Sequence, residues 1–83
     1  MPVRYRPDVL EQLLRHGVRP TADTPPQLVF DFVNDLYRYE LRRLRDALVN
    51  GRIPKVGYYD RVVDLRRKYP LVSIKAAHWL MTE

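Results

Sequence analysis

The sequence lacks cysteine altogether and holds only three glycines and one tryptophan in 83 residues. Without cysteine, the chain cannot form a disulfide, a CxxC redox site, or a cysteine-ligated zinc or iron–sulfur centre. Three scattered glycines exclude a glycine-rich phosphate-binding loop. No apolar run approaches the roughly 20 residues that a membrane-spanning helix needs. We therefore expect a cytoplasmic protein that makes no membrane contact and carries no cofactor.

The chain is rich in charge, and the positive sign dominates. It has 15 Lys and Arg residues against 10 Asp and Glu residues, for a net charge of +5 and a pI of about 9.9. At 46% hydrophobic residues, the composition is that of a folded globular chain. The length allows one small core. Residues 1–83 are therefore expected to form a single basic domain.

Proline and glycine divide the chain into segments whose apolar residues repeat at helical spacing, and no segment shows the alternation of a β-strand. The predicted helices cover about 7–16, 25–50, 55–68 and 73–81. Short connections between four helices are typical of a helix bundle. The sequence thus predicts an all-α fold, a small four-helix bundle with one long central helix and a short C-terminal helix.

Several residues are suited to the ends of these helices. Gly17 fits the left-handed position that closes the first helix, and Gly51 follows the last residues of the second. Thr24 and Gln27 have the spacing of a capping box for the long helix. Ser73 is the predicted N-cap of the C-terminal helix. That last helix carries Trp79, which we interpret as a core residue, with anchoring of a partner as the alternative.

The long helix has two apolar stripes in its first half and one in its second half. One neighbouring surface cannot bury both stripes. We therefore expect the first half to lie inside the bundle or in an interface between copies. The predicted self-association face consists of Val29, Phe32, Leu36 and Tyr39.

No arrangement of residues predicts catalysis. Ser73 is the only serine and is better explained as a helix cap. His16 and His78 lie far apart without metal-ligand spacing, and His78 is expected to be a half-buried structural residue. Asp31 and Asp35 are four residues apart, and solvated helix acids explain them better than a metal site. We expect no enzyme, no catalytic, cofactor-binding or metal-ligating residue, and no small-molecule substrate.

The basic residues offer a more informative pattern. If the second and third helices pack antiparallel, their cations can converge on one face with tyrosines interleaved. Arginine binds phosphate through two hydrogen bonds, and tyrosine stacks on exposed bases. The candidate face for a nucleic acid or an acidic partner consists of Arg38, Arg42, Arg45, Arg66, Arg67 and Lys68. A merely solvated face is the alternative, because charge runs on helices are commonly just that.

These patterns favour a non-enzymatic helical module that binds protein partners and self-associates through helix faces. Tyrosine and arginine are enriched in the cores of protein interfaces, which supports this hypothesis. Binding of RNA or single-stranded nucleic acid through the Arg/Tyr-rich face is the second hypothesis. Sequence-specific reading of a duplex is disfavoured, because the C-terminal segment offers few polar side chains.

Overall fold

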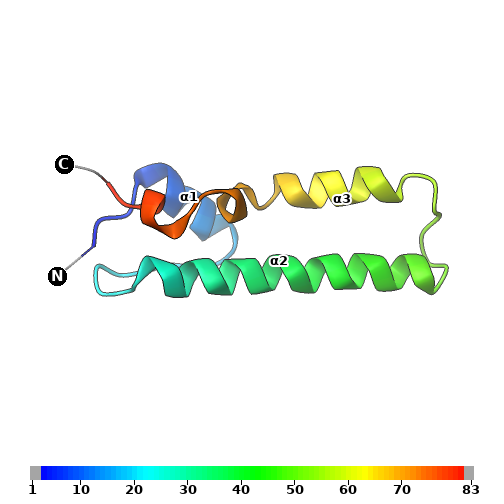
Figure 1. The fold of residues 1–83 in the computed structure, drawn as a ribbon, viewed down its shortest axis with the longest axis horizontal. Helices are drawn as coiled ribbons and strands as arrows, with labels where there is room; N and C mark the ends of the chain where they lie inside the picture. The colour runs from blue at the N-terminus through cyan, green and yellow to red at the C-terminus, as the bar shows by residue number, and fades with distance from the viewer. Residues whose placement is uncertain (1–2, 82–83) are drawn as a thin grey trace.

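The structure, a computed structural model, describes residues 3–81. In this part of the chain three α-helices form, namely α1 (Pro7–Arg15), α2 (Pro26–Val49) and α3 (Tyr58–Arg67), and two 3₁₀ turns follow, η1 (Pro70–Ser73) and η2 (Ala76–Trp79) (Figure 1). No strand occurs within residues 3–81. The all-α class is confirmed. Three of the four predicted helices form, and the predicted bundle of four does not.

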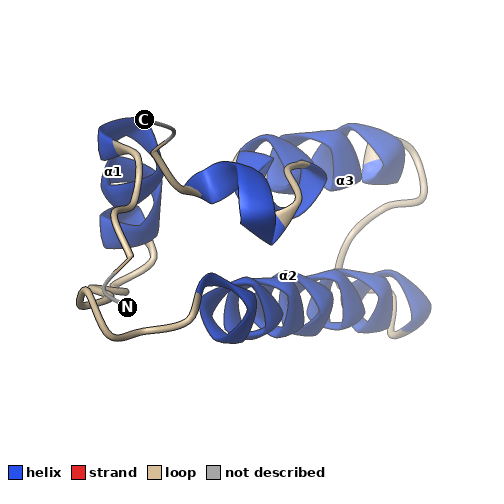
Figure 2. Ribbon diagram, turned by 60° about the vertical axis from the view of Figure 1, so that its left-hand side comes forward, coloured by secondary structure: helices blue, strands red, loops and turns tan. Residues whose placement is uncertain are grey.

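The molecule is elongated, with extents of 50 × 18 × 17 Å. Helix α2 runs along most of this length, and α3 returns antiparallel beside its second half (Figure 1). Helix α1 and the two 3₁₀ turns gather beside the first half of α2 (Figures 1 and 2). The fold is therefore a packed core at one end, from which a two-helix arm extends. We use the name arm for residues 38–68.

The core lies where α1, the first half of α2 and the C-terminal segment meet. Trp79 is fully buried, its ring lies 5.6 Å from that of Phe30, and its indole N–H donates to the Ile74 carbonyl at 3.1 Å. This confirms Trp79 as a core residue. The other buried members of the cluster are Tyr5, Val9, Leu13, Val29, Val33, Leu65, Tyr69 and Leu71.

Two helices end in the same hydrogen-bonded motif. After α1, the Gly17 N–H donates to the Leu14 carbonyl at 2.9 Å and the Val18 N–H donates to the Leu13 carbonyl at 2.9 Å. This pair of bonds is a Schellman cap, which needs the left-handed conformation that Gly17 adopts with φ 75°. Gly51, with φ 73°, closes α2 in the same way. The predicted ends of both helices are confirmed.

The predicted capping box of α2 is wrong. Pro25 occupies the N-cap position, and no side chain caps the helix. The Thr24 hydroxyl instead accepts a hydrogen bond from the Thr21 N–H at 3.0 Å, within the preceding turn. The Thr24 carbonyl accepts one from the Tyr5 hydroxyl at 2.6 Å. Because Pro26 has no N–H to satisfy in the first turn, α2 needs fewer capping bonds there.

The predicted helix over 73–81 is also wrong. Ser73 ends η1, Ile74 and Lys75 are extended, and η2 begins at Ala76. An isolated helix of nine residues is marginal in water, so tertiary packing decides its conformation. Here the irregular path buries Leu71, Ala76 and Trp79 against α2. Burial of these side chains outweighs the local preference for a helix.

The two ends of the described chain hold each other in place. The Arg6 N–H donates to the Trp79 carbonyl at 2.8 Å, and the Met81 N–H donates to the Arg4 carbonyl at 2.8 Å. The Arg6 guanidinium also donates to the His78 carbonyl at 3.1 Å. The two backbone bonds form one antiparallel β-bridge, between Tyr5 and Leu80. The bridge closes the core end over Trp79.

Candidate functional site

Within the described residues 3–81, one long side of α2 is covered by no other helix. Helices α1 and α3 and both 3₁₀ turns lie on the opposite side of α2 (Figures 1 and 2). Large apolar residues nevertheless lie on this uncovered side: Leu28 is 63% exposed, and Phe32 and Tyr39 are each 55% exposed. At about 100° per residue, the three side chains fall within about 40° of one another around the helix axis. We call them the outer stripe.

The structure divides the predicted self-association face. Phe32 and Tyr39 are exposed and belong to the outer stripe. Leu36 is half-buried against the core cluster. Val29 is only 5% exposed and belongs to the core, so it does not lie on a surface open to a partner. The apolar surface of the first half of α2 is thus buried along one edge and exposed along the other.

Charged residues of opposite sign follow one another along a single flank of the outer stripe. Asp31 and Asp35 lie on this flank in the first half of α2, and Arg38 and Arg42 continue it in the second half. All four are exposed, and the helical period places them within about 60° around the axis. The exposed side of α2 therefore carries an apolar stripe beside a flank whose charge changes from negative to positive.

A groove runs between α2 and α3 on one side of the arm. It has a volume of about 490 Å³, with Leu44 and Leu65 among its apolar lining residues. Its charged lining residues are Arg43, Arg52, Arg61 and Lys68 with Glu40 and Asp64. We call this feature the basic groove. Its cations come from α2, from α3 and from the connections that follow each of them, so the antiparallel packing of the arm assembles it.

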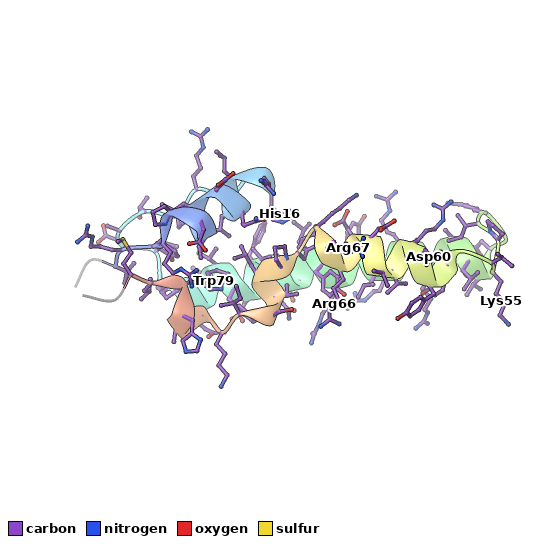
Figure 3. The ribbon with its side chains drawn as sticks, turned by 90° about the horizontal axis from the view of Figure 1, so that it is seen from above. His16, Lys55, Asp60, Arg66, Arg67 and Trp79 are labelled. Atoms are coloured by element: carbon purple, nitrogen blue, oxygen red, sulfur yellow. The ribbon has the colours of Figure 1, made fainter. Side chains whose placement is uncertain are left out.

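The candidate basic face divides between two sides of the arm. Arg38, Arg42, Arg45 and Arg66 do not line the basic groove, whereas Lys68 does. Arg67 lies 3.8 Å from Asp64 and lines a second hollow of about 390 Å³ next to α1. Figure 3 shows Arg66 and Arg67 on opposite sides of α3. Consecutive helical residues point about 100° apart, so residues 66–68 cannot share one face.

The arm carries the positive charge of the described chain. Residues 38–68 hold ten Lys and Arg residues against four Asp and Glu residues, a net charge of +6. Residues 3–37 and 69–81 together hold five of each sign. Within the described residues, the arm has one ion pair, between Arg67 and Asp64, and both partners are well exposed. The arm therefore presents cations that its own acids neutralise little.

A cluster of three side chains joins the arm to the core. The His16 ring stacks on the Tyr69 ring at 4.3 Å with an interplanar angle of 7°. The Tyr69 hydroxyl donates a hydrogen bond to the Glu40 carboxylate. Burial raises the pKa of the Tyr69 hydroxyl, and the hydrogen bond to Glu40 raises that pKa further. The cluster fixes Glu40 where the basic groove meets the second hollow, since it lines both.

The residues considered for catalysis are not brought together. Ser73 is exposed at the end of η1. His78 is also exposed, so the expectation of a half-buried histidine is wrong. Asp31 accepts a hydrogen bond from the Gln27 side chain at 2.9 Å. Within residues 3–81, no group of three or more His, Cys, Asp or Glu side chains is placed to hold a metal ion.

No helix in the described part of the chain is both long enough and apolar enough to cross a membrane.

Four surface residues of the two candidate sites lie outside the faces predicted from the sequence. Leu28 belongs to the outer stripe, and its position four residues before Phe32 is the signal that identifies it. Arg43, Arg52 and Arg61 line the basic groove. Arg43 lies three residues after Glu40 on α2, whereas Arg52 sits beyond the end of the helix. Only the path of the chain after Gly51 shows that Arg52 turns back toward α3.

Comparison with protein-family models, with curated proteins and with solved structures found no match. The function is therefore inferred from the residues of this chain.

Proposed function

We propose that the protein is a non-enzymatic helical interaction module that pairs with a second copy of itself through the uncovered side of α2. The observation that carries this proposal is the outer stripe together with its charged flank. Leu28, Phe32 and Tyr39 form an exposed apolar line on a helix of 24 residues, which is about 36 Å long. Contiguous exposed apolar residues with a polar border are typical of protein interaction sites.

An antiparallel pairing of two α2 helices satisfies both the apolar and the charged residues. With the two-fold axis placed between residues 35 and 36, Phe32 of one copy faces Tyr39 of the other. The same axis brings the flank of Asp31 and Asp35 alongside the flank of Arg38 and Arg42 in the second copy. The change of sign along one helix is therefore self-complementary across an isologous interface.

A parallel pairing is disfavoured by charge. It would place the two charged flanks on opposite sides of the interface, where their acids and arginines do not meet, and would bring two arms of net charge +6 side by side. The antiparallel pairing directs the two arms away from each other. It still leaves about 20 residues of each α2 in contact, or roughly 30 Å.

The first experiment measures the mass in solution of the protein and of a stripe variant, by sedimentation velocity over a range of micromolar concentrations. We expect a concentration-dependent dimer for the protein and a monomer for Phe32→Glu, because the substitution places a charge in the centre of the apolar contact. Tyr59→Glu is the matched control, since Tyr59 is 76% exposed on the arm and lies outside the stripe. A monomer at every concentration would refute the proposal.

A charge-swap cycle tests the antiparallel register. Asp35→Arg and Arg38→Asp each place like charges opposite each other across the interface and should weaken the dimer. The double variant exchanges the two signs and should restore it, because coupling between contacting residues is not additive. If the two effects simply add, the flanks do not meet and the proposed register is wrong.

A further inference from the structure

The basic groove and the outer stripe open on different sides of α2 and adjoin at Arg43, whose guanidinium lies 5.9 Å from the centre of the Tyr39 ring. The four cations of the groove, Arg43, Arg52, Arg61 and Lys68, form no ion pair within the described residues. Two carboxylates, of Glu40 and Asp64, lie in the same lining. The groove therefore has an excess of positive charge, which an anionic group from outside the chain would neutralise.

We infer that the basic groove binds the backbone of a single-stranded nucleic acid through its phosphates. Three of the four cations are arginines, whose planar guanidinium groups bind phosphate through two parallel hydrogen bonds. From Arg61 to Lys68 the groove follows seven residues of chain, or about 10 Å. Four cations spread over this length, with two carboxylates beside them, suit contacts with about three phosphates of one strand.

The width of the groove favours a single strand over a duplex. Packed helices have their axes about 8–10 Å apart and their side chains in contact, so the basic groove is a surface furrow of about that width, which suits a single extended chain. A duplex would contact only the rims of the groove. Leu44 and Leu65 contribute an apolar lining below the charged rims. This lining suits the sugars of a nucleotide strand better than it suits the carboxylates of an acidic peptide.

The distribution of charge over the whole arm supports the same partner. Net charge +6 on the arm creates a field that attracts a polyanion over a Debye length of about 8–10 Å. Arg38, Arg45 and Arg66 contribute to this field from the other side of the arm. Only in the basic groove, however, do cations from both sides of the arm's helix pair line one channel. The groove is therefore the site that holds the phosphate backbone of the nucleic acid.

The experiment is a fluorescence-anisotropy titration of the full chain against a labelled oligouridine of about twelve nucleotides, at several salt concentrations. Three phosphate contacts predict a logarithmic salt slope of about −2, which is a loss of affinity of roughly 16-fold for a fourfold rise in salt. Arg52→Glu/Arg61→Glu should weaken binding by about tenfold or more and flatten the slope by about 1.4.

The matched control is Arg45→Glu/Arg66→Glu, which changes the net charge equally on the side of the arm that does not form the groove. Both double variants replace exposed arginines, and circular dichroism checks that their helices are intact. The inference holds if the groove variant loses much more affinity than the control. An equal loss in both, or a larger loss in the control, overturns it.

Two further outcomes also overturn the inference. One is the absence of binding at low salt. The other is competition by polyglutamate of the same chain length as strongly as by oligouridine, which would identify an acidic protein as the partner. A duplex of the same length should bind more weakly than the single strand, and tighter duplex binding contradicts the argument from groove width.

A substitution at Glu40 should have the opposite effect on affinity for the nucleic acid. Glu40→Gln removes a negative charge from the groove and leaves an oxygen that still accepts the Tyr69 hydrogen bond. Oligouridine should therefore bind more tightly to this variant, and unchanged or weaker binding counts against the groove. Phe32→Glu should bind oligouridine like the unmodified protein, so failure of the dimer and failure of the groove are distinguishable.

Discussion

Tyr69 holds the arm to the core, and removing its hydroxyl isolates one interaction. Its ring is 3% exposed and stacks on His16, and its hydroxyl donates to Glu40. Tyr69→Phe preserves the ring and its packing. The substitution leaves the half-buried Glu40 carboxylate without the hydrogen-bond donor that the core supplies. The loss should therefore appear as a lower free energy of unfolding with little change in helix content.

The structure sets the expected size of this loss. A hydrogen bond to a charged group contributes about 1.5–3 kcal/mol. Glu40 is only half-buried and can recover part of its hydration, so we expect the low end, about 1.5 kcal/mol. For a domain of this size, such a change lowers the midpoint of thermal unfolding by about 6–12 °C.

Urea denaturation followed by circular dichroism measures the difference. The control is Tyr37→Phe, since the Tyr37 ring lies 5.3 Å from that of Tyr69 but its hydroxyl makes no hydrogen bond within the described residues. The control should change the free energy of unfolding by less than about 0.5 kcal/mol. If Tyr69→Phe is no more costly than Tyr37→Phe, the bond to Glu40 does not stabilise the junction.

The same hydroxyl predicts a dependence on pH. Because the pKa of Tyr69 is raised in the folded protein, the folded state keeps its proton at a pH where the unfolded state has lost it. Below the ordinary tyrosine pKa of about 10, both states are protonated and the contribution is constant. Above it, stability falls as the pH rises. Tyr69→Phe should lose less stability than the unmodified protein between about pH 9 and 11, and parallel curves would contradict this linkage.

Two further substitutions test the core and one helix end. Trp79→Ala empties the centre of the core, where Trp79 is fully buried, and should cost about 3–5 kcal/mol, a large part of the stability of a small domain. A thermal transition that stays within a few degrees of the original would contradict that placement. Gly17→Ala meets no atom within 4 Å but must hold φ near 75°, so we expect a loss of about 1 kcal/mol in urea denaturation. A gain in stability would show that the left-handed cap is not required.

The helices were predictable where local chemistry determines them. The cap after α1 depends on Gly17 and a few backbone bonds, so a short sequence window contains the information. The C-terminal segment was not predictable in the same way. Its apolar residues fit a helix equally well, and only the shape of the core selects the two 3₁₀ turns around Trp79. Thr24 failed as a cap for a similar reason, because Thr21 and Tyr5 compete for its groups.

The interaction surfaces were predictable only in part. The excess of apolar residues on α2 was visible in the sequence, but the choice between Val29 and Phe32 as the buried side depends on where α1 and the C-terminal segment pack. The antiparallel packing of α2 and α3 was the condition under which a shared basic face was predicted, and it occurs. The predicted face nevertheless differs from the basic groove, because Arg52 lies in a connection whose path no periodicity predicts.

Cysteine cross-linking tests the antiparallel pairing of α2 most directly, because the chain has no cysteine of its own. A cysteine at Asp35 lies next to the proposed two-fold axis, so two copies should form a disulfide rapidly under mild oxidation. A cysteine at Val49 lies about 40 Å from its equivalent in the antiparallel pair and should remain a thiol. The antiparallel pairing predicts a covalent dimer for Asp35→Cys alone. Cross-linking at Val49 as fast as at Asp35, or none at Asp35, would contradict it.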